Sequence, residues 1–174
     1  CQNSRNVCAQ FRDEINSIFQ KTGLLYSLNT DLQVERIVEN SPLTPEVEAT
    51  IATVKEPGTL ELLKEAILLH KSPYPTDIRD ATEKIWDAFE RLKTYYTTLN
   101  KRDSAAKIVN DMSGGQDDYI TLFDTEFNAL TKIGNNFRIR HHETDKIEIT
   151  DIRYYDYFFN RCLSLIALAI QYLQ

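Results

Sequence analysis

The clearest helical pattern in the chain is the segment TDIRDATEKIWDAFERLKTYY, residues 76–96. Its apolar residues are three and four positions apart, which is the spacing of one face of an α-helix. Those residues are Ile78, Ala81, Ile85, Phe89, Leu92 and Tyr96. Asp77 lies where an acidic side chain stabilises a first helical turn. The segment therefore predicts a long amphipathic helix with one face in the core.

The C-terminal segment, residues 151–174, has a still wider apolar face. Asp151 is a good N-cap residue. The apolar residues that follow it at helical spacing are Ile152, Tyr155, Phe159, Cys162, Ile166, Ala169, Ile170 and Leu173. Such a face is typical of a helix at the centre of a bundle. On it, Cys162 is expected to be a small core residue rather than a nucleophile.

Weaker helical patterns occupy residues 6–20, 46–54, 60–70, 104–112 and 119–133. Thr59 begins a capping-box sequence for the third of these, so the helix is expected to start there. His70 would end that helix, where the helix dipole favours the charged imidazole. Gly134 is expected to be the C-cap of the last of them.

Two short segments alternate in the manner of β-strands, residues 24–28 and 32–37, around the turn-forming Asn29-Thr30-Asp31. The sequence contains only five glycines and five prolines, which favours helices over many-turned β-structure. We predict an all-α fold with a small N-terminal β-hairpin. Residues 1–58 would form the N-terminal helix, the hairpin and a connecting segment, and residues 59–174 the helical bundle.

Charge and cysteine content narrow the functional classes. The net charge of −6 argues against a broad basic surface for nucleic acid, so any such contact must be local. Three cysteines, far apart and odd in number, indicate neither a disulfide framework nor a zinc site. No apolar run reaches the roughly 20 residues of a membrane span. A cytoplasmic protein without a metal or other cofactor is the expectation.

One stretch concentrates groups that suit phosphodiester chemistry: GNNFRIRHHE, residues 134–143. Histidine titrates near neutrality, and arginine offers phosphate a planar set of donors. The candidate catalytic residues are Arg138, His142 and His141, and the candidate substrate-binding residues are Arg140, Asn135 and Asn136. A histidine would transfer protons, an arginine would bind the scissile phosphate, and the ribose 2′-hydroxyl would be the nucleophile.

The same stretch has a structural alternative, a solvated basic turn whose charges pair with Glu143, Asp145 or Asp151. Asp87 and Glu90 would orient the site if their helix packs beside it, and otherwise they face solvent. A metal site on His141, His142 and Glu143 is not expected, because adjacent side chains diverge.

Two parts of the chain resemble a known family. The run DATEKIWDAFERLK, residues 80–93, then IGNNFRIRHHE, residues 133–143, and the long final helix are similar to bacterial abortive-infection proteins with HEPN-like C-terminal domains. The likeness covers roughly residues 60–174. The family motif is an arginine, usually four to six residues, then a histidine. Here Arg138 and His142 would correspond to that pair, with three residues between them.

The resemblance implies a HEPN-like helical bundle that acts on RNA in phage defence or as a toxin. It implies a homodimer, and an antitoxin or an upstream domain as further partners. The expected activity is that of a metal-independent endoribonuclease. The alternatives are a non-catalytic module for dimerisation or for nucleotide or RNA binding that regulates an upstream effector domain, and a purely structural helical domain.

Overall fold

The computed structural model describes residues 2–38, 41–140 and 143–173. Within them the chain forms seven α-helices and one two-stranded antiparallel sheet, which confirms the all-α class with a small N-terminal hairpin. The elements are α1 Gln2–Thr22, β1 Tyr26–Leu28, β2 Val34–Arg36, α2 Pro45–Ala52, α3 Pro57–His70, α4 Pro75–Leu92, α5 Lys101–Ser113, α6 Asp117–Asn136 and α7 Ile152–Tyr172.

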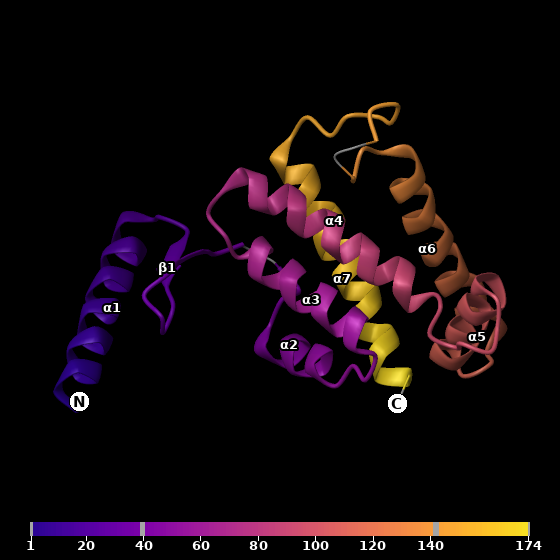
Figure 1. Ribbon diagram of the computed structural model, residues 1–174, viewed down its shortest axis with the longest axis horizontal. Helices are drawn as coiled ribbons and strands as arrows, with labels where there is room; N and C mark the ends of the chain where they lie inside the picture. The colour runs from indigo at the N-terminus through magenta and orange to yellow at the C-terminus, as the bar shows by residue number, and fades with distance from the viewer. Residues whose placement is uncertain (1, 39–40, 141–142, 174) are drawn as a thin grey trace.

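Helix α4 lies at the centre of the bundle, between α3 and α7 (Figure 1). The apolar face predicted from residues 76–96 is buried from Ile78 to Leu92. The face predicted for α7 is buried from Tyr155 onward, with Phe159 fully enclosed, whereas its first residue, Ile152, is exposed. Asp151 caps α7 as expected, because its side chain accepts the backbone N–H of Arg153 at 2.9 Å. These two amphipathic patterns therefore determine the core.

The start of α3 differs from the expectation. The helix begins at Pro57, and its N-cap is Glu56 rather than Thr59. The Glu56 carboxylate accepts the backbone N–H groups of Gly58 at 3.1 Å and Thr59 at 2.7 Å. Proline at the first helical position needs no N–H partner, so Pro57 fits this earlier start. The capping-box prediction was wrong because the Glu56 carboxylate caps the helix three residues upstream of Thr59.

Helices α5 and α6 form an antiparallel pair at the opposite end of the molecule from α1 (Figure 1). Gly114 ends α5 in the left-handed conformation, with φ of 59°, and Gly115 also has a positive φ. Helix α6 continues past Gly134 to Asn136. Gly134 is therefore not a C-cap, and its role is a packing one described below.

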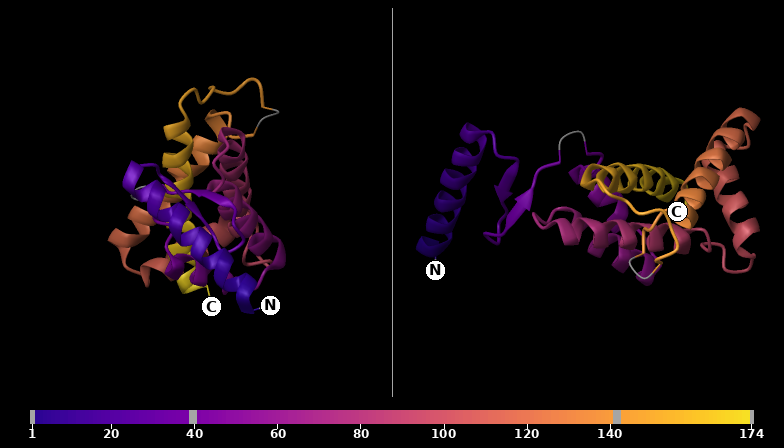
Figure 2. Two further views of the ribbon diagram at one scale, coloured as in Figure 1. Left: turned by 90° about the vertical axis from the view of Figure 1, so that its left-hand side faces the viewer. Right: turned by 90° about the horizontal axis from the view of Figure 1, so that it is seen from above.

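The hairpin and α1 form an N-terminal unit, defined here as residues 2–38, that stands beside the bundle (Figures 1 and 2). In the hairpin Tyr26 pairs with Arg36 and Leu28 with Val34. The Asn16 side chain of α1 bonds both to the N–H and to the C=O of Leu28. Helix α1 thus packs on the hairpin.

Arg36 connects this unit to the bundle. Its guanidinium donates to both carboxylate oxygens of Asp156 in α7, at 2.7 and 2.8 Å, and to the carbonyl of His70 at 3.2 Å. Its backbone N–H bonds the carbonyl of Lys71 at 2.7 Å. We call these four hydrogen bonds the Arg36 strap.

Helix α2 belongs with the bundle in its contacts, since it packs on α3 and α7 and its Ile51 is 1 % exposed. The predicted boundary between residues 58 and 59 stays a prediction. Among the helices described, none combines the length and apolarity needed to cross a membrane.

Candidate functional site

Residues 134–143, the segment predicted to act on a phosphodiester, join the end of α6 to the loop that leads into α7 (Figure 1). After Asn136 the chain becomes extended, and Phe137 forms an isolated parallel bridge with Ile147. The Arg138 N–H donates to the Ile147 carbonyl at 2.8 Å, and the Ile147 N–H to the Asn136 carbonyl at 2.9 Å. Ile139 is 2 % exposed. The segment is therefore anchored by its backbone and by one core residue.

Arg140 is attached to the central helix. Its Nε and one terminal nitrogen donate to Asp87 of α4 at 3.2 and 2.8 Å. Its other terminal nitrogen lies 3.8 Å from Glu143. The hydrogen bonds to Asp87 are the main reason why the pKa of Arg140 is raised. Asp87, considered from the sequence as an orienting carboxylate, therefore braces this segment.

Arg138 acts at a different position. It is half-buried, and its charge, like that of Arg79, acts on Tyr155 at the start of α7. Burial raises the pKa of the Tyr155 phenol, and the two guanidinium groups oppose that rise. Arg79 and Asp87 are eight residues apart on α4, about 12 Å along its axis. Arg140 is therefore bound to α4, whereas the charge of Arg138 acts on Tyr155 of α7.

The other predicted residues divide into two groups. Asn135 and Asn136 are exposed on the last turn of α6, and the Asn135 carbonyl accepts the ammonium of Lys146. His141 and His142 lie outside the described residues, so their proton-transfer role stays a prediction. Glu90, the second carboxylate considered, pairs with Lys93 and Lys101 at 2.5 Å each rather than with the segment's described residues.

Gly134 fixes how α6 meets α4. A Cβ atom at this position would lie 2.3 Å from Nε1 and 2.7 Å from Cδ1 of Trp86, closer than real Cβ contacts. Trp86 is 1 % exposed, and its ring meets Phe158 edge-on. Only glycine allows the indole to lie against the helix backbone here. The start of segment 134–143 is thereby held close to α4.

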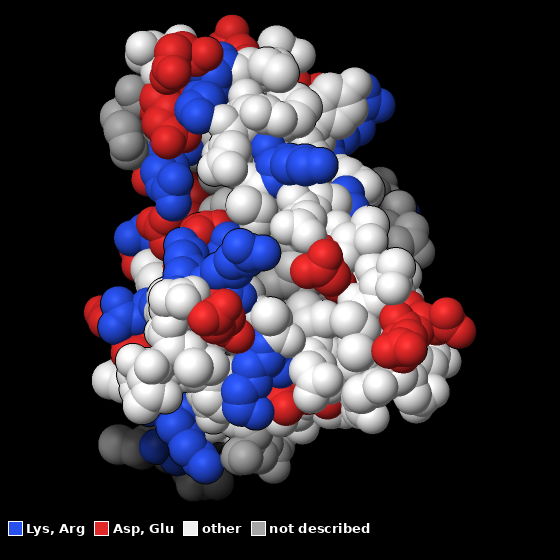
Figure 3. Space-filling model, turned by 90° about the vertical axis from the view of Figure 1, so that its right-hand side faces the viewer, with Lys and Arg blue, Asp and Glu red and all other residues white. Residues whose placement is uncertain are grey.

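Acidic and basic side chains are interspersed on the side of the molecule formed by α5 and α6, with uncharged surface between them (Figure 3). No continuous basic surface appears among the described residues on that face. This agrees with the net charge of −6. A contact with RNA would therefore have to be a local one.

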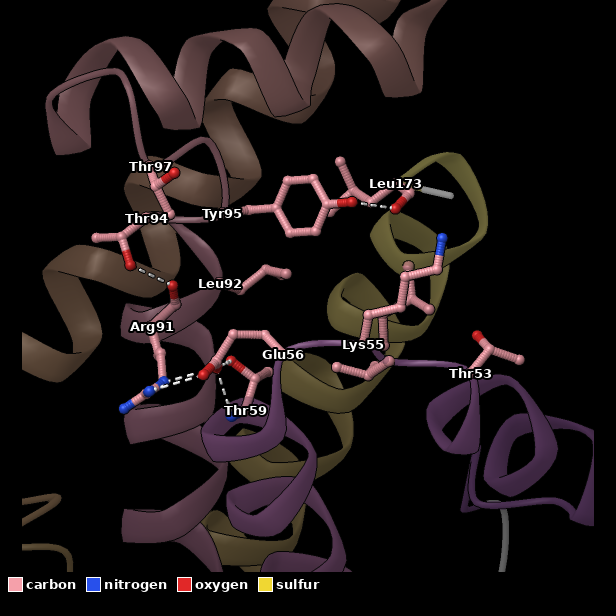
Figure 4. A pocket seen from close by; sticks show the side chains of 12 residues that line it. Thr53, Lys55, Glu56, Thr59, Arg91, Leu92, Thr94, Tyr95, Thr97 and Leu173 are labelled. Carbon is pink, nitrogen blue, oxygen red and sulfur yellow. Dashed lines mark hydrogen bonds and ion pairs between the residues drawn. The ribbon is translucent and has the colours of Figure 1, made fainter.

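A second candidate site was not foreseen from the sequence. A cavity of about 660 Å³ opens near the end of α7, between the α2–α3 connection and the end of α4 (Figure 4). It is lined by Thr53, Val54, Lys55, Glu56, Thr59, Arg91, Leu92, Thr94, Tyr95, Thr97, Ile170 and Leu173. These residues come from three segments distant in sequence, and none of them belongs to a motif that indicates ligand binding. Only folding brings them together.

No group of His, Cys, Asp and Glu side chains in the described parts of the chain is arranged to hold a metal ion. Comparison of the sequence with family models, and of the chain with curated proteins and solved structures, gives no match.

Proposed function

We propose that this protein is a HEPN-like helical bundle of the bacterial phage-defence or toxin type. Its residues 134–143 would form the active site of a metal-independent endoribonuclease. The observation that carries the proposal is the bond between Arg140 and Asp87, which holds a segment rich in arginine and histidine on the central helix. Anchoring by Ile139 and by the backbone pairing to Ile147 adds to it. Because these contacts hold the backbone on both sides of Arg138, they lower the entropic cost of placing its guanidinium on a phosphate.

The proposed reaction is an internal phosphoryl transfer. One histidine, His142 or its neighbour His141, takes the proton of the ribose 2′-hydroxyl, whose oxygen attacks the adjacent phosphorus. The bond from phosphorus to the 5′-oxygen breaks, and that oxygen receives a proton. The products are a 2′,3′-cyclic phosphate and a 5′-hydroxyl. Arg138 neutralises the phosphate, whereas Arg140 is a positioning residue because Asp87 occupies two of its nitrogens.

The test is cleavage of single-stranded RNA by purified protein in EDTA, with the new ends identified as 2′,3′-cyclic phosphates. We expect Arg138→Ala and His142→Ala to lower the rate about 100-fold or more. Arg102→Ala removes an exposed charge from α5 and is the matched control, with the wild-type rate expected. Equal cleavage by all four proteins would remove the assignment, and circular dichroism would verify that each is folded.

A second candidate function is favoured by the two carboxylates near Arg140. Asp87 and Glu143 neutralise part of the positive charge of Arg140, which would otherwise be available to bind a scissile phosphate. We propose as the alternative a non-catalytic module that binds RNA or a nucleotide and regulates an upstream effector domain. Fluorescence anisotropy with a 2′-deoxy oligonucleotide separates the two. Salt-dependent binding lost in Arg138→Ala, without any cleavage of RNA, would support this alternative.

The proposed homodimer draws support from α1. Val7, Phe11 and Ile18 share one face of that helix and are 65 %, 50 % and 53 % exposed. Exposed apolar surface of this kind is typical of protein–protein contacts. An antitoxin or an upstream domain remains part of the proposal because of the family resemblance alone. A cytoplasmic location remains part of it because the cysteines indicate no disulfide framework.

A further inference from the structure

The cavity near the end of α7 has the size and character of a small-molecule site. Its volume, about 660 Å³, lies within the range of roughly 300–1,000 Å³ found for ligand pockets. It lies at the C-terminal end of α7, whereas residues 134–143 precede the N-terminal end of that 21-residue helix (Figure 1). No described residue of that segment lines the cavity, although Asp87, which binds Arg140, lies one turn of α4 before the lining residue Arg91. The cavity and the proposed RNA site therefore have separate linings.

The inner wall of the cavity is apolar. Leu92 comes from α4, Ile170 and Leu173 from the end of α7, and Val54 from the α2–α3 connection. Protein cores are close-packed, so an apolar hollow of this size is not ordinary core packing. Burying hydrocarbon against such a wall stabilises a complex by about 25 cal/mol per Å². The wall thus favours a ligand with an apolar body.

The cavity is lined by one acidic and two basic side chains, so one positive charge has no acidic counterpart in the lining. Glu56 accepts two hydrogen bonds from Arg91, both at 2.7 Å, and these also lower the pKa of the Glu56 carboxyl. That pair neutralises itself. Lys55 lines the same cavity and forms no ion pair with a described residue; its side chain extends toward Leu173 (Figure 4). The lining therefore carries a net charge of about +1 near neutral pH.

Hydroxyl groups complete the mouth. The Tyr95 hydroxyl donates to the Leu173 carbonyl and so ties the end of α4 to the end of α7. Thr53 and Thr97 contribute further hydroxyls on either side (Figure 4). We infer that this cavity binds a small apolar monocarboxylate, with the hydrocarbon against Leu92 and Ile170 and the carboxylate at Lys55. Nothing in the proposed RNA chemistry requires such a ligand.

The probe for this site is octanoate, and binding is measured by isothermal titration calorimetry on the full chain. We expect saturable binding with one site per chain. Octylammonium, which has the same hydrocarbon and the opposite charge, should bind at least tenfold more weakly. Lys55→Gln should weaken octanoate at least fivefold, because a charge-assisted hydrogen bond is lost.

A neighbouring pair of threonines supplies the matched control. Thr97 lines the cavity and Thr98 does not, yet both are exposed in the same turn. Thr97→Trp should fill the mouth and abolish octanoate binding, whereas Thr98→Trp should bind like the wild type. Absence of saturable octanoate binding to the wild type would overturn the inference. So would unchanged binding in Thr97→Trp, or equal affinity for octylammonium.

Discussion

Gly134 is a residue whose lack of a side chain sets the distance between two helices. Alanine normally stabilises a helix by about 1 kcal/mol over glycine. Here the added Cβ would lie 2.3 Å from a Trp86 ring atom, so α6 or the indole must move. We expect Gly134→Ala to lower the free energy of unfolding by about 1–3 kcal/mol. Urea denaturation measures it.

Asn135→Ala is the matched control, since Asn135 is exposed in the same helical turn. It should change the free energy of unfolding by about 0.5 kcal/mol or less. If Gly134→Ala proved as stable as the control, the tight contact with Trp86 would not be present in solution.

His70 is a buried imidazole that should make stability depend on pH. It is 1 % exposed, and its ring stacks on that of Phe159 with 3.7 Å between the ring centroids. Neither ring nitrogen has a hydrogen-bond partner among the described residues. Burial, assisted by the charge of Arg36 and opposed by that of Asp156, lowers its pKa from 6.5 to about 4. The helix dipole favours the charged form, as expected from the sequence, but burial outweighs it.

The sign follows from the direction of that shift. Between pH 6.5 and about 4 the unfolded chain binds a proton that the folded chain does not, so stability falls as the pH falls. The loss should reach about 3 kcal/mol at the lower limit. Urea denaturation at pH 7 and pH 4.5 measures it. His70→Leu should lose less stability between these pH values than the wild type, and an equal loss would show that His70 does not titrate this way.

The Arg36 strap is a contact between elements, and its removal should loosen the N-terminal unit rather than the bundle. Arg36 and Asp156 are 16 % and 20 % exposed, so their ion pair is largely shielded from solvent. We expect Arg36→Met to destabilise the protein by about 2 kcal/mol. Amide exchange should become faster in the hairpin, measured by mass spectrometry, and stay unchanged in α5.

Arg12→Met is the control for the strap, because the Arg12–Asp13 pair is confined to α1. Exposed pairs of this type contribute between 0 and 1 kcal/mol. Hairpin exchange in Arg36→Met that matched this control would mean that the strap does not hold the unit in place.

Among the helices and strands, those with a clear apolar periodicity could be predicted from the sequence. Helices α4 and α7 were predictable because every third or fourth residue is apolar, and the hairpin because its strands alternate around Asn29. The brace from Arg140 to Asp87 joins residues 53 positions apart, so spacing carried no signal for it. The cavity was unforeseeable for the same reason, and Gly134 looked like a cap because the packing of Trp86 is not encoded locally.

At the level of the whole molecule, the contacts of α2 predict where the chain divides. Ile51 of α2 is 1 % exposed and belongs to the bundle core, whereas α1 packs on the hairpin. A chain of residues 41–174 should therefore unfold cooperatively. A chain of residues 59–174, cut at the boundary predicted from sequence, should be at least about 2–4 kcal/mol less stable. Thermal unfolding followed by circular dichroism distinguishes these outcomes, and equal stability would favour the sequence-based boundary.

The packing of Trp86 also gives the molecule an intrinsic optical probe. It is the only tryptophan in the sequence, and it is enclosed where α4 meets the end of α6. Emission excited selectively at the indole therefore arises from a single site, next to the segment that Arg140 holds on α4. A red shift or quenching on mixing with an oligonucleotide would report a rearrangement at that junction, without any label attached to the protein.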